Sequence, residues 1–143
     1  MILPDVNTLI YAFRKDSLQY RAYSEWLEAV VNGDSDYGIS PQVLCSVVRI
    51  STNPRVFKQP SERSEALEFC ATLLKQENCH LIQPGRRHWP IFVDLCQKAQ
   101  ASGNLIQDAW FAALAIEHGC EWVTSDREYA RFPGLHWYPP FDR

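Results

Sequence analysis

The chain has 143 residues, of which 46% are hydrophobic and 22% charged. This composition is typical of one soluble globular domain and argues against a disordered chain. No apolar run is long enough to span a membrane, and the segment from Met1 to Asp5 lacks the features of a secretory signal peptide. The formal net charge of −3 disfavours a broadly basic nucleic-acid-binding protein but permits an acidic site with local basic patches.

The 5 cysteines are spread singly along the chain, and Cys70 and Cys79 are the closest pair. No CxxC element exists, so neither a compact zinc site nor a disulfide scaffold is expected. Buried, reduced thiols are the simpler interpretation, and they indicate a cytoplasmic protein.

In the first half of the chain, short strands are expected at residues 1–5 and 37–39. Helical spacing of apolar residues follows each of them, at residues 9–13, 17–31 and 40–52. Ser40 and Pro41 form a clear helix start, since serine caps free N–H groups and proline fits the first turn. That helix should end before Asn53-Pro54, because the residue before a proline avoids the helical conformation.

In the second half, helices are expected at residues 61–78, 89–101 and 105–118, with a short turn at 129–132. Strands are expected at residues 80–82, 122–124 and 135–138. Gly119 should terminate the alanine-rich helix at 105–118. Short strands that alternate with longer helices predict an α/β fold with a parallel sheet covered on both faces.

Three aspartates occupy unusual positions. Asp5 follows the first expected strand, Asp126 follows the strand at 122–124, and Asp108 lies in the first turns of the alanine-rich helix. Parallel sheets bind ligands at the carboxyl ends of their strands, where the strand order reverses. If the first and fourth strands are neighbours, the three side chains meet there. Each aspartate alone also fits a helix cap or a turn.

Three neighbouring carboxylates repel one another, and a divalent cation removes that repulsion. An all-oxygen ligand set without clustered cysteine or histidine indicates Mg²⁺ or Mn²⁺ rather than Zn²⁺. Such a site activates water and neutralises charge on a phosphodiester. The residues therefore predict hydrolytic phosphoryl transfer, and they do not by themselves identify the substrate.

Several segments, in this order and spacing, resemble the PIN-domain ribonucleases, and more narrowly the VapC toxins of bacterial toxin–antitoxin pairs. The resemblance covers nearly the whole chain. The matching segments are Asp5–Leu9, Val48–Phe57, Gly103–Ala109, Ala113–Gly119, Thr124–Arg127 and Phe132–Leu135.

The resemblance implies a single PIN domain over residues 1–143, folded as a three-layer α/β/α sandwich with a central parallel sheet. It implies Mg²⁺-dependent (or Mn²⁺-dependent) endoribonuclease activity on an RNA substrate. It places Asp5, Asp108 and Asp126 on the acidic metal-site positions as catalytic residues and metal ligands. Asn7 and Ser125 are expected to support them, with Asn7 hydrogen-bonded to the Asp5 carboxylate or to the strand-to-helix turn.

The resemblance also implies two partners, a second copy of the chain and a cognate VapB-like antitoxin, and no membrane association. The helices at 17–31 and 61–78 carry more aromatic residues than one small core needs. Tyr23, Trp26 and Phe69 are therefore expected to contribute to a homodimer surface.

One position departs from the family pattern. Many PIN domains carry a further glutamate on the helix that here begins at Pro41, where this chain has Gln42 and Ser46. No acidic residue occurs between Gly38 and Gln59. Fewer anionic ligands predict weaker metal binding. Glu117 is a poor substitute, because it lies about half a rotation away from Asp108 on the same helix.

Basic residues could line a path for RNA: Arg49, Arg55, Arg86 and Arg87. Ordinary solvated surface is the alternative, and it is preferred for Lys58. Arg49 is distinct because it lies within an apolar stretch, which suggests a functional or ion-paired guanidinium near the acids.

Two other functions remain open at this point. One is a PIN-like binding module that is catalytically weak or inactive and acts through its dimer or a protein partner, and the missing helix acid favours it. The other is a hydrolase of the haloacid-dehalogenase type, which also places aspartates after strands. That class uses a D-x-D pair, and Asn7 at the second position argues against it.

Overall fold

The computed structural model describes residues 1–141. Within them, five short parallel strands form one sheet in the order β3-β2-β1-β4-β5. The strands span Ile2–Pro4 (β1), Tyr37–Ile39 (β2), Cys79–Leu81 (β3), Glu121–Val123 (β4) and Trp137–Tyr138 (β5). The central strand β1 pairs with β2 on one side and β4 on the other. The strand order therefore reverses next to β1, and the first and fourth strands are neighbours, the condition under which Asp5 and Asp126 meet.

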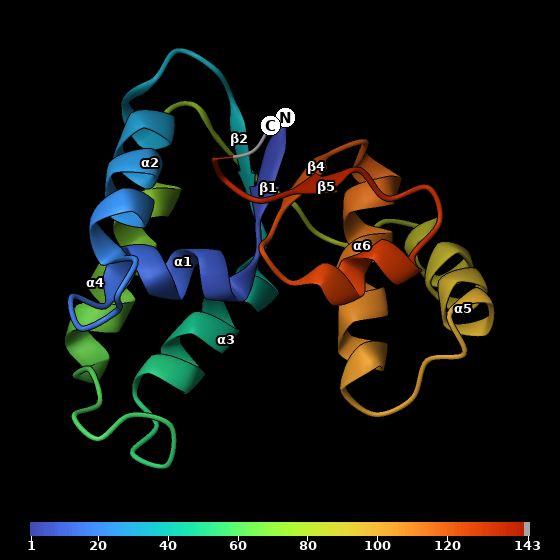
Figure 1. Ribbon diagram of the computed structural model, residues 1–143. Coiled ribbons are helices and arrows are strands. Elements are labelled where there is room, and N and C mark those ends of the chain that lie inside the picture. The colour runs from blue at the N-terminus through green and yellow to red at the C-terminus, as the bar shows by residue number, and fades with distance from the viewer. Residues whose placement is uncertain (142–143) are drawn as a thin grey trace.

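Helices cover both faces of this sheet, so the expected three-layer α/β/α sandwich is confirmed. In Figure 1, α1 to α4 lie on one side of the strands and α5 and α6 on the other. Contacts between elements follow the same division, because α1 packs on α2 and α3, α3 packs on α4, and α5 packs on α6. The helices span Val6–Phe13 (α1), Tyr20–Asn32 (α2), Pro41–Ser51 (α3), Arg63–Leu74 (α4), His88–Lys98 (α5) and Asn104–His118 (α6).

Local sequence chemistry accounts for the helix ends around the sheet. Ser40 caps α3 by accepting a hydrogen bond from the Val43 N–H at 3.3 Å, and Pro41 occupies the first turn. Gly119 ends α6 in the left-handed conformation, with φ of 64°, which costs a glycine little. A 3₁₀ turn, η1 (Arg127–Arg131), begins directly after Asp126, which caps it.

The start of α4 differs from the expected start at Ser61. The helix begins at Arg63, and the Ser61 hydroxyl instead accepts a hydrogen bond from the buried Arg14 guanidinium at 2.9 Å. Arg14 also forms an ion pair with Asp16 at 2.6 Å and donates to the Gln59 carbonyl at 2.8 Å. These bonds hold the segment between α3 and α4 against the end of α1, which in turn fixes the position of α3.

The aromatic residues expected at a homodimer surface pack largely against the core, which leaves less of them for a second copy than expected. Tyr23 is only 3% exposed and packs edge-on against Tyr11, with 5.2 Å between ring centroids. Phe69 packs against Phe13 at 4.8 Å, and Trp26 is half-buried. The additional rings fill the space between α1, α2 and α4 rather than a surface for a second copy.

The thiols of all 5 cysteines are free. Among residues 1–141, no helix has both the length and the apolar character needed to cross a bilayer.

Candidate active site

The carboxyl ends of β1 and β4 bring Asp5 and Asp126 to the same edge of the sheet. The Asp5 N–H donates to the Val123 carbonyl at 2.9 Å, so the residue after β1 is still tied to the end of β4. Asp5 is 6% exposed, and its Oδ1 accepts from the Val6 N–H at 2.6 Å, which caps α1. The capping interpretation and the active-site interpretation of Asp5 are therefore compatible.

Thr124 connects the two aspartates. Its hydroxyl donates to Asp5 Oδ2 at 2.6 Å and accepts from the Asp126 N–H at 3.1 Å. Asp126 Oδ1 in turn accepts from the Glu128 N–H at 3.0 Å and caps η1. The sequence analysis missed Thr124. The available signal was its position directly after the strand β4 and two residues before Asp126, which caps η1. A hydroxyl at that position reaches the residue that follows the neighbouring strand β1.

Asp108 reaches the same place from α6. Its side chain is half-buried, and its Oδ1 accepts a hydrogen bond from the Tyr129 hydroxyl at 3.2 Å. Tyr129 is 1% exposed and comes from η1, three residues after Asp126. The sequence analysis did not single out Tyr129 either, since the pattern around it predicted only a short turn.

A cavity of about 320 Å³ joins these side chains. Three anionic groups line it, together with one guanidinium and several neutral polar side chains. The polar and charged lining residues are Asp5, Asp108, Asp126, Arg49, Asn7, Ser46, Asn104, Gln107 and Tyr129. The cavity is therefore an acidic pocket with a single basic side chain among its lining residues.

Burial and mutual repulsion raise the pKa values of two of the aspartates. Burial raises the pKa of Asp5 to about 6, and the charges of Asp108 and Asp126 add to the increase, while hydrogen bonds from Thr124 and Val6 oppose it. The pKa of Asp108 is also raised, first by burial and then by the charge of Asp126. Burial and the nearby carboxylates raise the pKa of Tyr129 far above its usual range, so its hydroxyl remains a donor.

The chemistry of this donor set fits a divalent cation of the Mg²⁺ or Mn²⁺ type. Three carboxylates that destabilise one another's charged forms gain from a shared cation, and oxygen ligands suit these metals. Within residues 1–141, no three His, Cys, Asp or Glu side chains are already gathered closely enough to enclose a metal ion. Asp5, Asp108 and Asp126 line one cavity and are the residues that would hold such a cation.

Asn7 and Ser125 take less direct positions than expected. The exposed Asn7 lines the cavity, but the hydrogen bonds that Asp5 accepts from the described residues come from Val6 and Thr124 instead. Ser125 is exposed between Thr124 and Asp126. Of the two α3 residues expected at the position of the family's further acid, Ser46 lines the cavity and Gln42 is exposed.

The structure separates the four arginines expected to bind RNA. Arg49 lines the acidic pocket from α3. Its guanidinium forms no ion pair within 4.0 Å with any of the described residues. Arg55 is exposed in the segment after α3, where its N–H donates to Asn53 Oδ1 at 2.9 Å. It therefore remains available at the surface.

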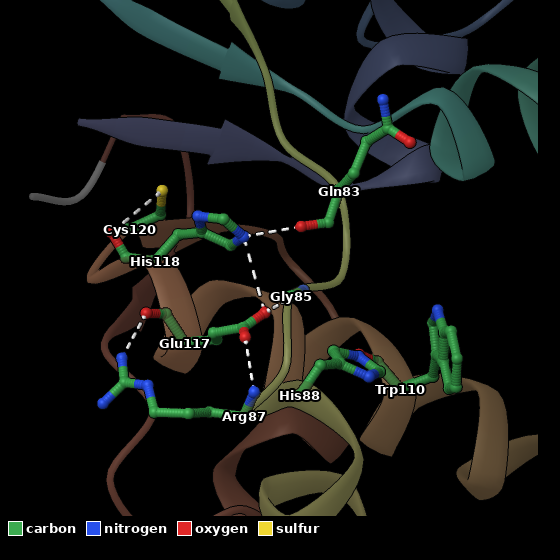
Figure 2. Close-up of polar contacts among 8 residues, drawn as sticks. All are labelled: Gln83, Gly85, Arg87, His88, Trp110, Glu117, His118 and Cys120. Atoms are coloured by element: carbon green, nitrogen blue, oxygen red, sulfur yellow. Dashed lines mark hydrogen bonds and ion pairs between the residues drawn. The ribbon is translucent and has the colours of Figure 1, made fainter.

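Arg86 and Arg87 lie elsewhere, at the other end of α6 from Asp108. Figure 2 shows the Arg87 guanidinium on the Glu117 carbonyl, at 2.9 Å. The Glu117 carboxylate accepts from the N–H groups of Gly85 and Arg87, at 2.7 Å and 3.0 Å. Since Glu117 is nine residues beyond Asp108, it lies roughly 13 Å further along the helix axis. Glu117 anchors this loop rather than the acidic pocket.

Comparisons with known proteins agree with this arrangement. The PIN domain family model matches residues 2–135. VapC ribonuclease Mb2897 of Mycobacterium bovis is 38% identical over 142 residues, which cover 99% of this chain and 97% of that protein. Ribonuclease VapC25 of Mycobacterium tuberculosis is 38% identical over 141 residues, covering 98% of this chain and 99% of the relative.

Solved structures show the same fold at much lower identity. In a crystal structure of VapBC2 from Rickettsia felis bound to a DNA fragment from their promoter, the matching chain has a TM-score of 0.72 and 19% identity, covering 97% of this chain and 98% of that chain. FitAcB from Neisseria gonorrhoeae matches with a TM-score of 0.61 and 15% identity, covering 99% of each chain. The fold, the acidic pocket and the near-complete matches together show that this chain belongs to the PIN-domain family and, within it, to the VapC ribonucleases.

Proposed function

We propose that this protein is a divalent-metal-dependent endoribonuclease that acts as the toxin of a VapBC-type pair. The observation that carries the proposal is the convergence of Asp5, Asp108 and Asp126 on one pocket at the strand-order reversal. The names of the full-length relatives support ribonuclease activity. The reaction is hydrolysis of an RNA phosphodiester bond.

Each carboxylate in this proposal is held by a donor of the chain itself. Asp5 is fixed by two hydrogen bonds and Asp126 by its capping bond to Glu128. Asp108 is held by the Tyr129 hydroxyl. These bonds orient each carboxylate before metal or RNA binds. When bound, Mg²⁺ or Mn²⁺ supplies the activation of water and the neutralisation of charge on the phosphodiester.

The substrate approaches a pocket that is acidic inside, so positive charge near its entrance is required to hold a polyanion. Arg49 lines the pocket itself, and Arg55 is exposed in the segment that follows α3. We assign Arg49 to a phosphate near the reacting bond and Arg55 to the flanking backbone, as contacts that position RNA rather than read its sequence. Arg86 and Arg87 are left out of this path.

The metal requirement tests the proposed activity. Purified protein should cleave RNA in millimolar Mg²⁺ or Mn²⁺, lose the activity in EDTA and recover it when either metal is restored. Weak affinity is expected because α3 contributes no acidic side chain to the pocket. Cleavage that persists undiminished in EDTA would exclude the metal mechanism. A fully folded protein that cleaves no RNA in either metal would favour a non-catalytic binding module.

We further propose that the cognate antitoxin inhibits the enzyme by placing an arginine or lysine side chain in the acidic pocket. Such a cation would compensate the same carboxylates that bind metal and would block RNA at that point. The antitoxin should therefore bind in competition with Mn²⁺, as calorimetry with and without the metal would measure. Unchanged affinity for the doubly substituted Asp5→Asn, Asp108→Asn protein would reject this mode of inhibition and leave the nuclease proposal intact.

A homodimer remains part of the proposal, on different residues from those first expected. Leu67 and Leu74 of α4 are 51% and 39% exposed, and their spacing of seven residues places them on one face of the helix. Light scattering at micromolar concentration would establish whether the protein is a dimer.

A further inference from the structure

Tyr129 is a buried tyrosine whose only polar atom faces the acidic pocket. The ring lies 5.5 Å from that of Trp122 and 5.9 Å from that of Phe132, by centroid. The side chain is 1% exposed, yet its hydroxyl reaches Asp108 Oδ1 at 3.2 Å. A phenylalanine would fill the same space, so the packing alone does not account for the hydroxyl group.

The geometry of η1 explains how the hydroxyl arrives there. Asp126 is the extended residue that caps η1, Tyr129 lies within η1, and both side chains line the cavity. The Tyr129 N–H donates to the Asp126 carbonyl at 3.3 Å. One short turn therefore delivers a carboxylate and a phenolic hydroxyl to the same pocket.

Asp108 needs such a donor more than the other two aspartates. Asp5 accepts two hydrogen bonds and Asp126 accepts one from its own turn, whereas Asp108 comes from α6. In the described part of the chain, its side chain accepts a hydrogen bond from Tyr129 alone. The charge of Asp126 repels the Asp108 carboxylate, so an unheld side chain would turn away from the pocket toward solvent.

The bond is long for a hydroxyl donating to a carboxylate, since charge-assisted bonds of this type measure about 2.5–2.7 Å. A bond of this length orients the carboxylate and leaves its negative charge available to a cation. It also occupies Oδ1 and leaves Oδ2 of Asp108 without a donor among residues 1–141.

We propose that Tyr129 is a positioning residue that holds Asp108 in the orientation needed to bind the divalent cation. The proposal rests on the proposed function for the identity of the cation. It assigns to η1 a second role beyond presenting Asp126, and it makes the η1–α6 contact part of the active site.

The test compares Tyr129→Phe with Tyr37→Phe. Tyr37 is a matched control, because it is also fully buried and its hydroxyl donates to the Leu73 carbonyl at 2.6 Å, in a contact between β2 and α4. Mn²⁺ affinity is measured by calorimetry without RNA, and cleavage is measured separately as kcat and KM. Unfolding in EDTA reports whether each variant is folded.

Tyr129→Phe should weaken Mn²⁺ binding by about 10-fold, the lower end of the effect of losing a group that orients a ligand. It should lower kcat while leaving the KM for RNA unchanged. Tyr37→Phe should lower stability and leave Mn²⁺ affinity as in the wild type. In an Asp108→Asn background, Tyr129→Phe should have no further effect on Mn²⁺ binding, because the anionic ligand that Tyr129 orients is then absent.

Wild-type Mn²⁺ affinity in Tyr129→Phe, together with weakened affinity in Asp108→Asn, would overturn the positioning role and leave the proposed function standing. Equal losses of affinity in Tyr129→Phe and Tyr37→Phe would also overturn it, since the effect would then come from general loosening. A third outcome separates the two proposals. If the wild type cleaves no RNA, and Tyr129→Phe weakens Mn²⁺ binding while Tyr37→Phe does not, the positioning role is supported and the nuclease proposal is rejected.

Discussion

Replacing Asp108 by asparagine is expected to reduce RNA cleavage by at least about 100-fold, in the range seen when one preorganised electrostatic group is removed from an active site. Asparagine has nearly the same shape but no charge. It can still accept the hydrogen bond from Tyr129, whose hydroxyl lies at 3.2 Å. The fold should therefore be preserved while the anionic ligand is lost. Initial cleavage rates in saturating Mn²⁺, with circular dichroism of each protein, provide the measurement.

Asp94→Asn is the matched control for this experiment. Asp94 is an exposed aspartate of α5 that pairs with Lys98 at 2.9 Å within the same helix. Exposed pairs of this kind contribute little to stability, and the substitution changes the net charge by the same amount as Asp108→Asn. Its cleavage rate should match the wild type. Equal activity of Asp108→Asn and the wild type would remove Asp108 from the mechanism.

Asp5→Asn is expected to make the metal-free protein more stable at pH 7. The pKa of Asp5 is raised to about 6 in the folded protein, from an ordinary aspartate value of 3.8. A carboxylic acid with a raised pKa binds its proton more tightly when folded, so its ionisation costs folding free energy as the pH rises from about 4 to about 6. The cost is roughly 3 kcal/mol when complete. Asparagine avoids it.

Denaturant unfolding in EDTA at pH 4 and pH 7 measures this effect. The variant should exceed the wild type by about 1 to 3 kcal/mol at pH 7. It should exceed it by little at pH 4, close to the ordinary pKa of 3.8, where the folded and unfolded states differ by only a fraction of a bound proton. Saturating Mg²⁺ should reduce the difference at pH 7, since it stabilises the wild type by mass action. A variant that is less stable than the wild type at pH 7 would show that Asp5 is held mainly for structure.

The arginines illustrate which site residues a linear pattern identifies. Arg49 was singled out because it interrupts an apolar stretch of α3, and it lines the pocket. Arg87 stood in a basic loop, and its guanidinium is bonded to the far end of α6. Each side chain carries one positive charge, so charge does not show which of them lies at the pocket. The packing of residues 82–87 on α6 is what places Arg87 away from it.

The aromatic residues show the same limit. Their number suggested an external interface, but Tyr23 and Phe69 close the space between α1, α2 and α4. Counting rings measures how much apolar area must be buried and says nothing about where it is buried.

The sequence by itself determined the order of strands and helices, the cap at Ser40, the end of α6 at Gly119 and the three acids at chain positions that follow strands or begin a helix. These features depend on neighbours within a few residues, through spacing, capping and backbone preference. The tertiary structure alone decided that β4 lies beside β1, that Thr124 bridges Asp5 and Asp126, and that Tyr129 reaches Asp108. Apart from the local bond between Thr124 and Asp126, those contacts join segments that are separated in the chain. The packing of whole layers brings their partners together, and no local pattern encodes it.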